Sequence, residues 1–203
     1  MPSITTPLYQ TIFFGSIDAA KFLIEHEANV NRPDSHGTPP IVKAAEMGSI
    51  KPTQQRQYEE IILSLQKHSA DINAKDGNGK TALHRTAYQN NSSMLEFLLR
   101  HGANASATDN RGETPLFPAA YRNNEASASA LLKYGAQVNV GNIYKWTPLH
   151  KTYKWGADKV KKLLLANKAN PDALDELGRK PYQATIPEQI YLGLDSFPTL
   201  ESL

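Results

Sequence analysis

The sequence predicts an all-α repeat solenoid made of stacked helix-turn-helix units. Thr114-Pro115-Leu116 recurs as Thr147-Pro148-Leu149, and earlier in the chain as Thr81-Ala82-Leu83. Related strings starting at 6, 39 and 180 keep this register, so successive starts lie 33, 42, 33, 33 and 33 residues apart. A nearly constant period of this length indicates one supersecondary unit per repeat, because each unit buries its apolar face only against a neighbour. The composition agrees, since 40% apolar and 21% charged residues are typical of a folded chain.

Local chemistry places two helices in each unit. Thr114 is expected to be an N-cap, with Pro115 at the first helical position, where a missing N–H costs nothing. The pair Leu131-Leu132 marks the second helix, which ends at Gly135. A residue that tolerates the left-handed conformation marks the turn between the two helices. The turn residues of the five units are Gly15, Gly48, Asn90, Asn123 and Gly156.

A short finger joins each unit to the next. Asp109-Asn110-Arg111-Gly112 has the composition of a turn, because aspartate and asparagine bond to nearby backbone and glycine adopts positive φ. An extended piece, Val138-Asn139-Val140 in the fourth unit, leads into the following turn. Each unit is therefore expected to consist of a helix, a turn, a second helix and a β-hairpin-like finger.

These motifs resemble the ankyrin repeat family. The resemblance rests on Gly79-Lys80-Thr81-Ala82-Leu83-His84, on Leu98-Leu99-Arg100-His101-Gly102-Ala103-Asn104 and on Gly112-Glu113-Thr114-Pro115-Leu116, and it extends over roughly residues 6–185. It implies an L-shaped stack of about five repeats, with a concave groove formed by the first helices and the fingers. It also implies a binding role rather than catalysis.

The predicted array occupies residues 1–185 and is followed by a tail at 186–203. Its repeats start near residues 6, 39, 81, 114 and 147, with a partial copy at 180. The second unit is nine residues too long, and the extra segment at 49–57 is polar and contains proline. Such an insertion predicts a surface loop or an extension of the second helix. The tail is expected to cap the exposed end of the stack with its apolar residues.

Simple counts argue against several function classes. The chain has no cysteine, so it has neither a disulfide framework nor a thiolate metal site. A formal charge of +2 argues against a strong nucleic-acid footprint, and no apolar run is long enough to cross a bilayer. The first residues show neither a secretory signal nor a transit peptide, so an intracellular protein, cytoplasmic or nuclear, is expected.

The histidines predict neither catalysis nor a metal site. His84 and His150 occupy one repeat slot, and the family resemblance implies a structural role for them. His26, His68 and His101 share another slot, so they should lie one repeat apart, roughly 10 Å, which is too far to share a zinc ion. Nucleophile elbows, phosphate-binding glycine loops and zinc-protease motifs are absent from the sequence. We therefore expect no enzyme activity, no cofactor and no small-molecule substrate.

The predicted function is protein binding, by a module that acts as an adaptor, a scaffold or a subunit of a larger assembly. The two positions before each inter-helix turn carry at least one large aromatic residue or methionine in every unit, and the resemblance implies that they face the groove. These residue types, together with arginine, are enriched at protein interfaces. The finger at 142–146 adds an aliphatic and two aromatic residues at a tip that should be solvated. The predicted partner-binding residues are Met47, Tyr88, Tyr121, Arg122, Tyr144, Trp146, Tyr153, Lys154 and Trp155.

Three alternatives remain open. The residues before the turns could be half-buried packing residues, above all Phe13 and Phe14 in the end repeat. The lysines of the fifth repeat could form a solvated helix face, attract an acidic partner segment, or make the chain a nucleic-acid-associated regulator. Asn31, Asn73 and Asn139 resemble the finger asparagines that are hydroxylated in ankyrin proteins, although the simpler role of such residues is a turn hydrogen bond. The lysines concerned are Lys151, Lys154, Lys159, Lys161 and Lys162.

Overall fold

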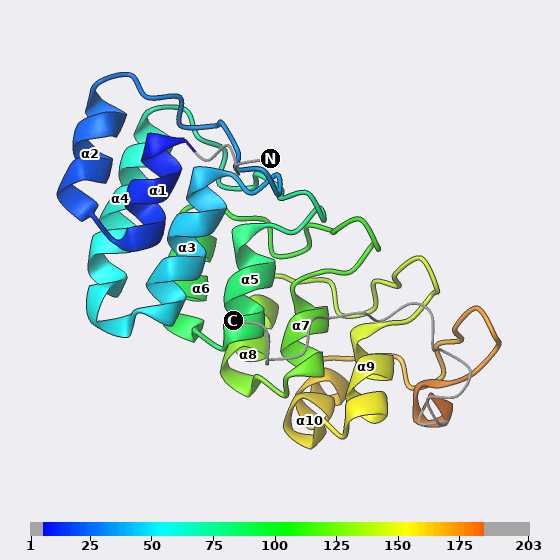
Figure 1. The fold of residues 1–203 in the computed structure, drawn as a ribbon. Helices are drawn as coiled ribbons and strands as arrows, with labels where there is room; N and C mark the ends of the chain where they lie inside the picture. Colours follow the sequence, from blue (N-terminus) through cyan, green and yellow to red (C-terminus); the bar gives the residue numbers. More distant parts are fainter. Residues whose placement is uncertain (1–5, 185–203) are drawn as a thin grey trace.

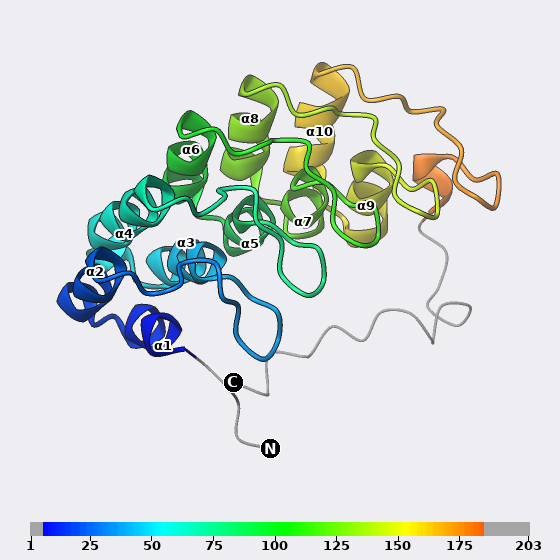
Figure 2. The ribbon, with the colours of Figure 1, turned by 90° about the horizontal axis from the view of Figure 1, so that it is seen from above.

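The structure, a computed structural model, describes residues 6–184, which form ten α-helices and no strand (Figure 1). The helices lie in two layers, and neighbours within a layer come from successive repeats (Figure 2). The first-helix layer contains α1 (Pro7–Phe14), α3 (Pro40–Ile50), α5 (Ala82–Gln89), α7 (Leu116–Tyr121) and α9 (Pro148–Trp155). The second-helix layer contains α2 (Ile17–Glu25), α4 (Gln55–Lys67), α6 (Ser92–Arg100), α8 (Glu125–Lys133) and α10 (Asp158–Ala166). The predicted all-α repeat solenoid is confirmed.

The helix ends follow the expected capping chemistry in most repeats. The Thr6 hydroxyl accepts the N–H of Tyr9 at 3.1 Å at the start of α1, and Gly15 ends the helix with φ of 82°. The expected N-cap at Thr114 is wrong, because its Oγ1 is buried without a hydrogen-bond partner in the described part of the chain and α7 begins at Leu116. The backbone N–H that such a cap would satisfy, that of Phe117, bonds instead to the Thr114 carbonyl at 2.9 Å.

Most of the segment at 49–57 is helical, so the loop alternative is wrong, whereas residues 55–57 extend the second helix as the other alternative predicts. α3 continues to Ile50, a 3₁₀ turn η1 follows at Pro52–Gln54, and α4 begins at Gln55. Gly48 therefore lies inside α3 and is no inter-helix turn residue. A Cβ at Gly48 would lie 2.5 Å from Met94 Cε and 2.9 Å from Tyr58 Cβ, so glycine permits the close approach of α3 to its neighbours. Close contact is the physical reason for glycine here, rather than a left-handed backbone.

The core runs continuously through the stack. Buried apolar side chains from Leu8 to Ala169 form one cluster between the two helix layers. Each large aliphatic side chain in it contributes roughly 1.5–3 kcal/mol relative to exposure. The Tyr58 hydroxyl, fully buried, donates to the Ile12 carbonyl at 3.1 Å and ties α4 to the first repeat. A second, small cluster contains Phe117, Trp146 and Ala184 beside the last fingers.

Each finger is a turn closed by one acidic or amide side chain. The Oδ1 atom of this residue accepts the backbone N–H groups two and four positions later, at 2.8 to 3.0 Å. Its own N–H bonds to the carbonyl four positions later. Successive fingers are joined as well, for example by the N–H of Ile143 to the Arg111 carbonyl at 2.9 Å. The residues that close the fingers are Asp34, Asp76, Asp109, Asn142 and Asp175.

The C-terminal end of the described array is a 3₁₀ turn, η2 (Pro181–Gln183), which packs on α9. The Gln183 side chain accepts the backbone N–H of Lys180 at 2.8 Å. The tail at 186–203, which the sequence predicts to cap the stack, lies outside the described residues. No helix within residues 6–184 combines the length and the apolar character that crossing a membrane requires.

Candidate functional site

Three aromatic rings from three successive repeats form a continuous row at the C-terminal ends of the first helices. Tyr88 at the end of α5 stacks on Tyr121 of α7, with ring centroids 6.3 Å apart and planes at 9°. Tyr121 contacts Trp155 of α9 edge to face, at 4.8 Å and 82°. Tyr88 is 37% exposed and Trp155 is 44% exposed. We call Tyr88, Tyr121 and Trp155 the aromatic strip.

Two cations lie on the aromatic strip. The Arg122 guanidinium sits 4.3 Å from the centroid of the Tyr88 ring. The Lys154 ammonium lies 5.4 Å from Trp155 and 5.3 Å from Trp146, so it connects the strip to the buried finger tryptophan. All three distances are within the range of cation–π attraction. The exposed rings are suited to contact with apolar groups, and the positive charges of Arg122 and Lys154 are suited to contact with acidic groups.

Two asparagines fix the helix ends that carry the strip. Asn124 is buried, and its Nδ2 donates to the carbonyls of Ala87 at 2.7 Å and Tyr88 at 3.2 Å. It thereby satisfies carbonyls at the end of α5 that have no helical partner. Asn123 accepts the N–H of Val160 through its side chain at 3.1 Å, which links α7 to α10. The strip is therefore held by rigid inter-repeat contacts.

The expected exposure is wrong at two of the nine predicted residues. Met47 and Trp146 are each only 7% exposed. Met47 is buried because α3 continues past it, so it is not at a helix end. The Trp146 indole packs with Phe117, and its Nε1 donates to Asp175 at 3.1 Å. These contacts bury the ring, so it is not exposed to a partner.

Two further predicted residues lie away from the strip. Tyr144 is half-buried against the cluster of Trp146. Tyr153 packs partly against the main core, and its ring faces Lys161 of α10 at 5.0 Å. The structure therefore brings together the predicted residues Tyr88, Tyr121, Arg122, Lys154 and Trp155.

The buried histidines serve the architecture. His84 Nδ1 accepts the N–H of Thr81 at 3.1 Å, and Nε2 donates to the Glu113 carbonyl of the next finger at 2.9 Å. His150 repeats this arrangement with Thr147 and with the Arg179 carbonyl. Burial lowers the pKa of both imidazoles. Both rings therefore remain neutral in the folded protein at neutral pH.

The helix-end histidines contact backbone carbonyls of their own helices. The Nδ1 atoms of His26, His68 and His101 lie 2.7 to 2.8 Å from the carbonyl four residues earlier. Across the described residues, no three His, Asp or Glu side chains are grouped as metal ligands would be.

Several of the fifth-repeat lysines have partners within the chain. Lys151 pairs with Glu113 at 3.3 Å, and Lys161 pairs with Asp158 at 2.5 Å. The Lys161–Asp158 pair lies at the surface, where water and salt screen it, so it contributes little to stability, whereas both side chains of the Lys151–Glu113 pair are mostly shielded from water. A nucleic-acid role for these lysines stays a prediction, since no contact in the structure tests it.

The finger asparagines bridge successive repeats. Asn73 donates to the Gly102 carbonyl at 3.4 Å and accepts the Asn104 N–H at 2.8 Å. Asn139 makes the same pair of bonds to Lys168 and Asn170. Their structural role is therefore an inter-repeat hydrogen bond, and their hydroxylation stays a prediction.

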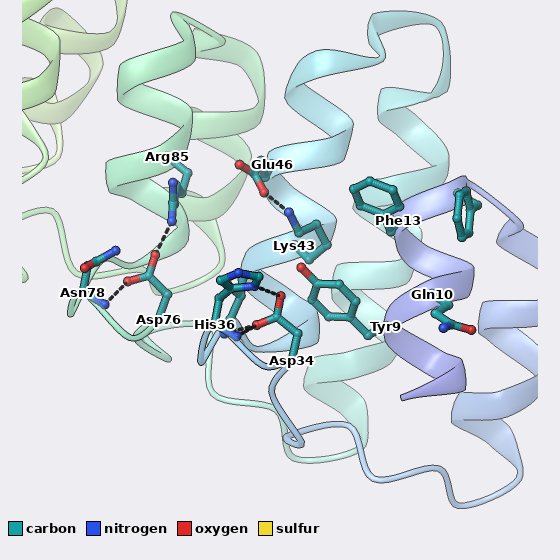
Figure 3. A pocket seen from close by; sticks show the side chains of 12 residues that line it. Tyr9, Gln10, Phe13, Asp34, His36, Lys43, Glu46, Asp76, Asn78 and Arg85 are labelled. Atoms are coloured by element: carbon teal, nitrogen blue, oxygen red, sulfur yellow. Dashed lines mark hydrogen bonds and ion pairs between the residues drawn. The ribbon is translucent and has the colours of Figure 1, made fainter. Parts of the chain in front are cut away.

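A second candidate site lies at the N-terminal end of the first-helix layer. None of its lining residues is among the nine predicted partner-binding residues. A groove of about 580 Å³ opens between α1, α3, α5 and the first two fingers (Figure 3). The pair Phe13-Phe14 is the sequence signal that could indicate this groove, although half-buried packing is the alternative interpretation of these two rings. Phe13 is 44% and Phe14 71% exposed, so these rings are accessible to a ligand. The lining of this groove includes Tyr9, Phe13, Asp34, Lys43, Asp76 and Arg85.

Charged groups meet on the floor of this N-terminal groove. Lys43 forms an ion pair with Glu46, and Arg85 bonds to Asp76 at 2.5 Å. Burial alone would raise the pKa of Asp34, but hydrogen bonds from Thr38, Tyr9 and His36 outweigh it and hold the pKa below its ordinary value. Burial and the neighbouring Asp34 carboxylate raise the pKa of the Tyr9 hydroxyl. At neutral pH the groove thus contains a firmly ionised Asp34 beside a protonated tyrosine.

Comparison with known proteins identifies the repeat. A family model described as ankyrin repeats in three copies matches residues 53–142 and 105–175, and one for the ankyrin repeat matches residues 5–35. The chain belongs to the ankyrin repeat family. A putative ankyrin repeat protein of Rickettsia felis (strain ATCC VR-1525 / URRWXCal2) is 33% identical over 94 residues, which are 46% of this chain and 28% of that protein. The match thus spans less than a third of that relative. Ankyrin repeats generally mediate protein–protein interaction and are typically non-catalytic.

Proposed function

We propose that this ankyrin chain is a non-catalytic binding module, an adaptor, scaffold or subunit of a larger assembly, and that its aromatic strip contacts a protein partner. The observation that carries the proposal is the continuity of the strip. Tyr88, Tyr121 and Trp155 come from three repeats, contact one another and stay partly exposed. Tyrosine, tryptophan and arginine dominate the binding energy of protein interfaces.

The strip is already ordered before any partner arrives. Arg122 and Lys154 lie on its rings, and Asn124 holds the end of α5. Because the side chains are held by contacts across repeats, little rotamer freedom is lost on association. A rigid array of anchors is therefore suited to capturing an extended segment or a flat surface.

The charge of this region indicates the chemistry of the partner. Residues 81–184 contain 14 lysines and arginines against eight aspartates and glutamates, a net charge of +6. Residues 6–80 contain eight against nine, a net charge of −1. Complementary potentials favour encounter with the correct partner. The partner surface on the strip is therefore expected to combine apolar anchors with acidic residues.

The test is a comparative capture from a lysate of the source organism. The tagged wild-type chain and a Tyr121→Ala, Trp155→Ala variant are compared by quantitative mass spectrometry at two salt concentrations. The matched control is Tyr134→Ala, since Tyr134 is 36% exposed at the end of α8 and also has a lysine, Lys133, over its ring at 6.0 Å. Circular dichroism verifies that all three proteins are folded.

The expected result is a stoichiometric partner that the wild type and Tyr134→Ala retain and the strip variant loses. Losing two central aromatic anchors should weaken binding by about a hundredfold or more, since each such residue contributes about 2 kcal/mol or more. Retention of the same partner by the strip variant would remove the strip from the interface.

A further inference from the structure

The second finger shows how a finger carboxylate of this chain pairs with a cation. Asp76 uses Oδ1 for two backbone N–H groups and Oδ2 for Arg85 Nη2, at 2.5 Å. The last finger repeats the pairing between Asp175 and Arg179, at 2.7 Å. In both fingers the carboxylate is almost completely buried, so the guanidinium compensates a charge that has lost its water. These two fingers serve as internal templates for the first.

The first finger has the carboxylate but not the guanidinium. Asp34 Oδ1 accepts the N–H groups of His36 at 2.9 Å and Thr38 at 2.8 Å, and its side chain is 7% exposed. The residue in the position of Arg85, 42 residues earlier, is Lys43. The Lys43 ammonium turns to Glu46 and lies over the ring of Phe13 at 5.5 Å instead. Lys43 therefore does not pair with Asp34 as Arg85 pairs with Asp76.

The groups that do face Asp34 are weaker partners than an arginine. The Tyr9 hydroxyl bonds to it but carries no charge. The His36 ring, 3.6 Å away, has a side chain that is 84% exposed to water. Figure 3 shows both beside the carboxylate, at the edge of the open groove. Asp34 thus has a buried, ionised oxygen at the wall of a solvent-connected space.

The rest of the groove suits a flat cation. Its lining contains three carboxylates, from Asp34, Glu46 and Asp76, against the two permanent cations Lys43 and Arg85. The exposed rings of Phe13 and Phe14 form its outer wall and contact each other edge to face, with centroids 5.2 Å apart. Aromatic faces attract cations, and a guanidinium can stack on a ring while it bonds to a carboxylate.

We infer that this N-terminal groove binds an arginine side chain of a protein partner, with the guanidinium on Asp34 and its plane against Phe13. Arginine is favoured over lysine because its planar fork matches the carboxylate and its charge is more weakly hydrated. The bound arginine would supply at Asp34 what Arg85 supplies at Asp76. This inference is independent of the aromatic strip, which is basic and shares none of the residues that line the groove.

The test uses the intact chain and two short peptides. The probe is N-acetyl-Gly-Gly-Arg-Gly-Gly-amide, and the control peptide has citrulline, which keeps the shape of arginine without its charge. Binding is followed by two-dimensional ¹H–¹⁵N spectra, in which the backbone amides of His36 and Thr38 report directly on Asp34. Only the arginine peptide should shift these two resonances in a saturable way, and added salt should weaken the effect.

The decisive variant is Asp34→Asn, and the chain itself shows that it should fold. Asn142 closes the fourth finger with an amide oxygen, accepting the N–H groups of Tyr144 and Trp146 at 3.0 Å. Asparagine at 34 thus keeps the backbone bonds and removes the charge. Binding of the arginine peptide should fall about tenfold or more, as expected for a lost hydrogen bond to a charged group. Phe13→Leu should weaken binding as well, while Tyr134→Ala should leave it unchanged.

Three outcomes would overturn the inference. The citrulline peptide could bind as well as the arginine peptide, Asp34→Asn could bind with wild-type affinity, or the shifts could map to α9 instead of the first finger. The Tyr121→Ala, Trp155→Ala variant should bind the arginine peptide normally. A negative result for the arginine peptide therefore does not bear on the aromatic strip, and a negative result for the strip does not bear on the arginine site.

Discussion

Glutamine in place of His84 and His150 should remove a pH dependence of stability that the wild-type chain shows below neutral pH. Each imidazole Nδ1 accepts the N–H of a threonine N-cap at 3.1 Å, and each Nε2 bonds to a carbonyl of the next finger. A proton on Nδ1 would break the first bond and leave a charge in the core. Burial accordingly lowers the pKa of both groups in the folded protein.

The sign of the effect follows from that direction. As the pH falls, the unfolded chain takes up protons near pH 6.5, the ordinary value for histidine, whereas the folded chain resists until a lower pH. The stabilising contribution is complete above about pH 6.5 and declines as the pH falls toward the folded pKa values. Each histidine changes the free energy of unfolding by at most about 1.4 kcal/mol per pH unit, so both together change it by at most about 4 kcal/mol between pH 6.5 and 5.

The assay is urea unfolding followed by circular dichroism at pH 7.5, 6.5, 5.5 and 5. The His84→Gln, His150→Gln variant is the comparison, because Gln183 occupies the same slot in the last copy and its Oε1 accepts the N–H of Lys180 at 2.8 Å. The lowered pKa values of Asp34 and Asp175 affect stability only at more acidic pH, below about 4. An equal decline of wild type and variant between pH 6.5 and 5 would refute the reasoning.

Three further substitutions test the packing, each by urea unfolding at pH 7.5. Gly48→Val should destabilise by about 1–3 kcal/mol because its side chain would overlap Met94 and Tyr58, and a wild-type midpoint would contradict this contact. Asn124→Ala should cost about 1–3 kcal/mol, since buried carbonyls at the end of α5 lose their donor, and no loss would mean that water replaces it. Lys145→Gly should stabilise by about 1 kcal/mol, because Lys145 alone among the fingertip residues is a non-glycine with positive φ, at 58°; a loss of stability would show that its side chain is needed.

The repeat register determines most of what the sequence could predict. Thr, Pro, Leu and the turn residues recur because each helix pair needs the same caps, so both layers and the fingers follow from local chemistry. Repeat register predicts that Met47 lies at a helix end, whereas the insertion prolongs α3 and makes Met47 a core residue. The burial of Trp146 does not follow from register, because it depends on Phe117 and Asp175, which are 29 residues away in either direction. A contact that only one repeat makes leaves no periodic signal.

Because the repeats share one register, each position can be compared with the equivalent position in the other repeats. A residue that differs from its equivalents is therefore informative. The slot of His84 holds Tyr9 in the first repeat, and Tyr9 reaches the Asp34 side chain where His84 reaches a backbone carbonyl. The slot of Arg85 holds Lys43, which leaves Asp34 without a guanidinium. These two departures, Tyr9 in the first repeat and Lys43 in the second, both lie in the lining of the N-terminal groove.

These departures also make the two ends of the first-helix layer different in charge preference. A site for a guanidinium at α1 and α3 and a basic aromatic strip at α5, α7 and α9 call for opposite charges on whatever lies along the face. The centres of the two sites are separated by two to three helix spacings of about 10 Å, which an extended segment spans with roughly six to nine residues. A segment with arginine at one end and acidic residues at the other would satisfy both sites in one orientation only, because its reversal places like charges together. Orientation would then be imposed by electrostatics on a scaffold whose repeats are otherwise nearly equivalent.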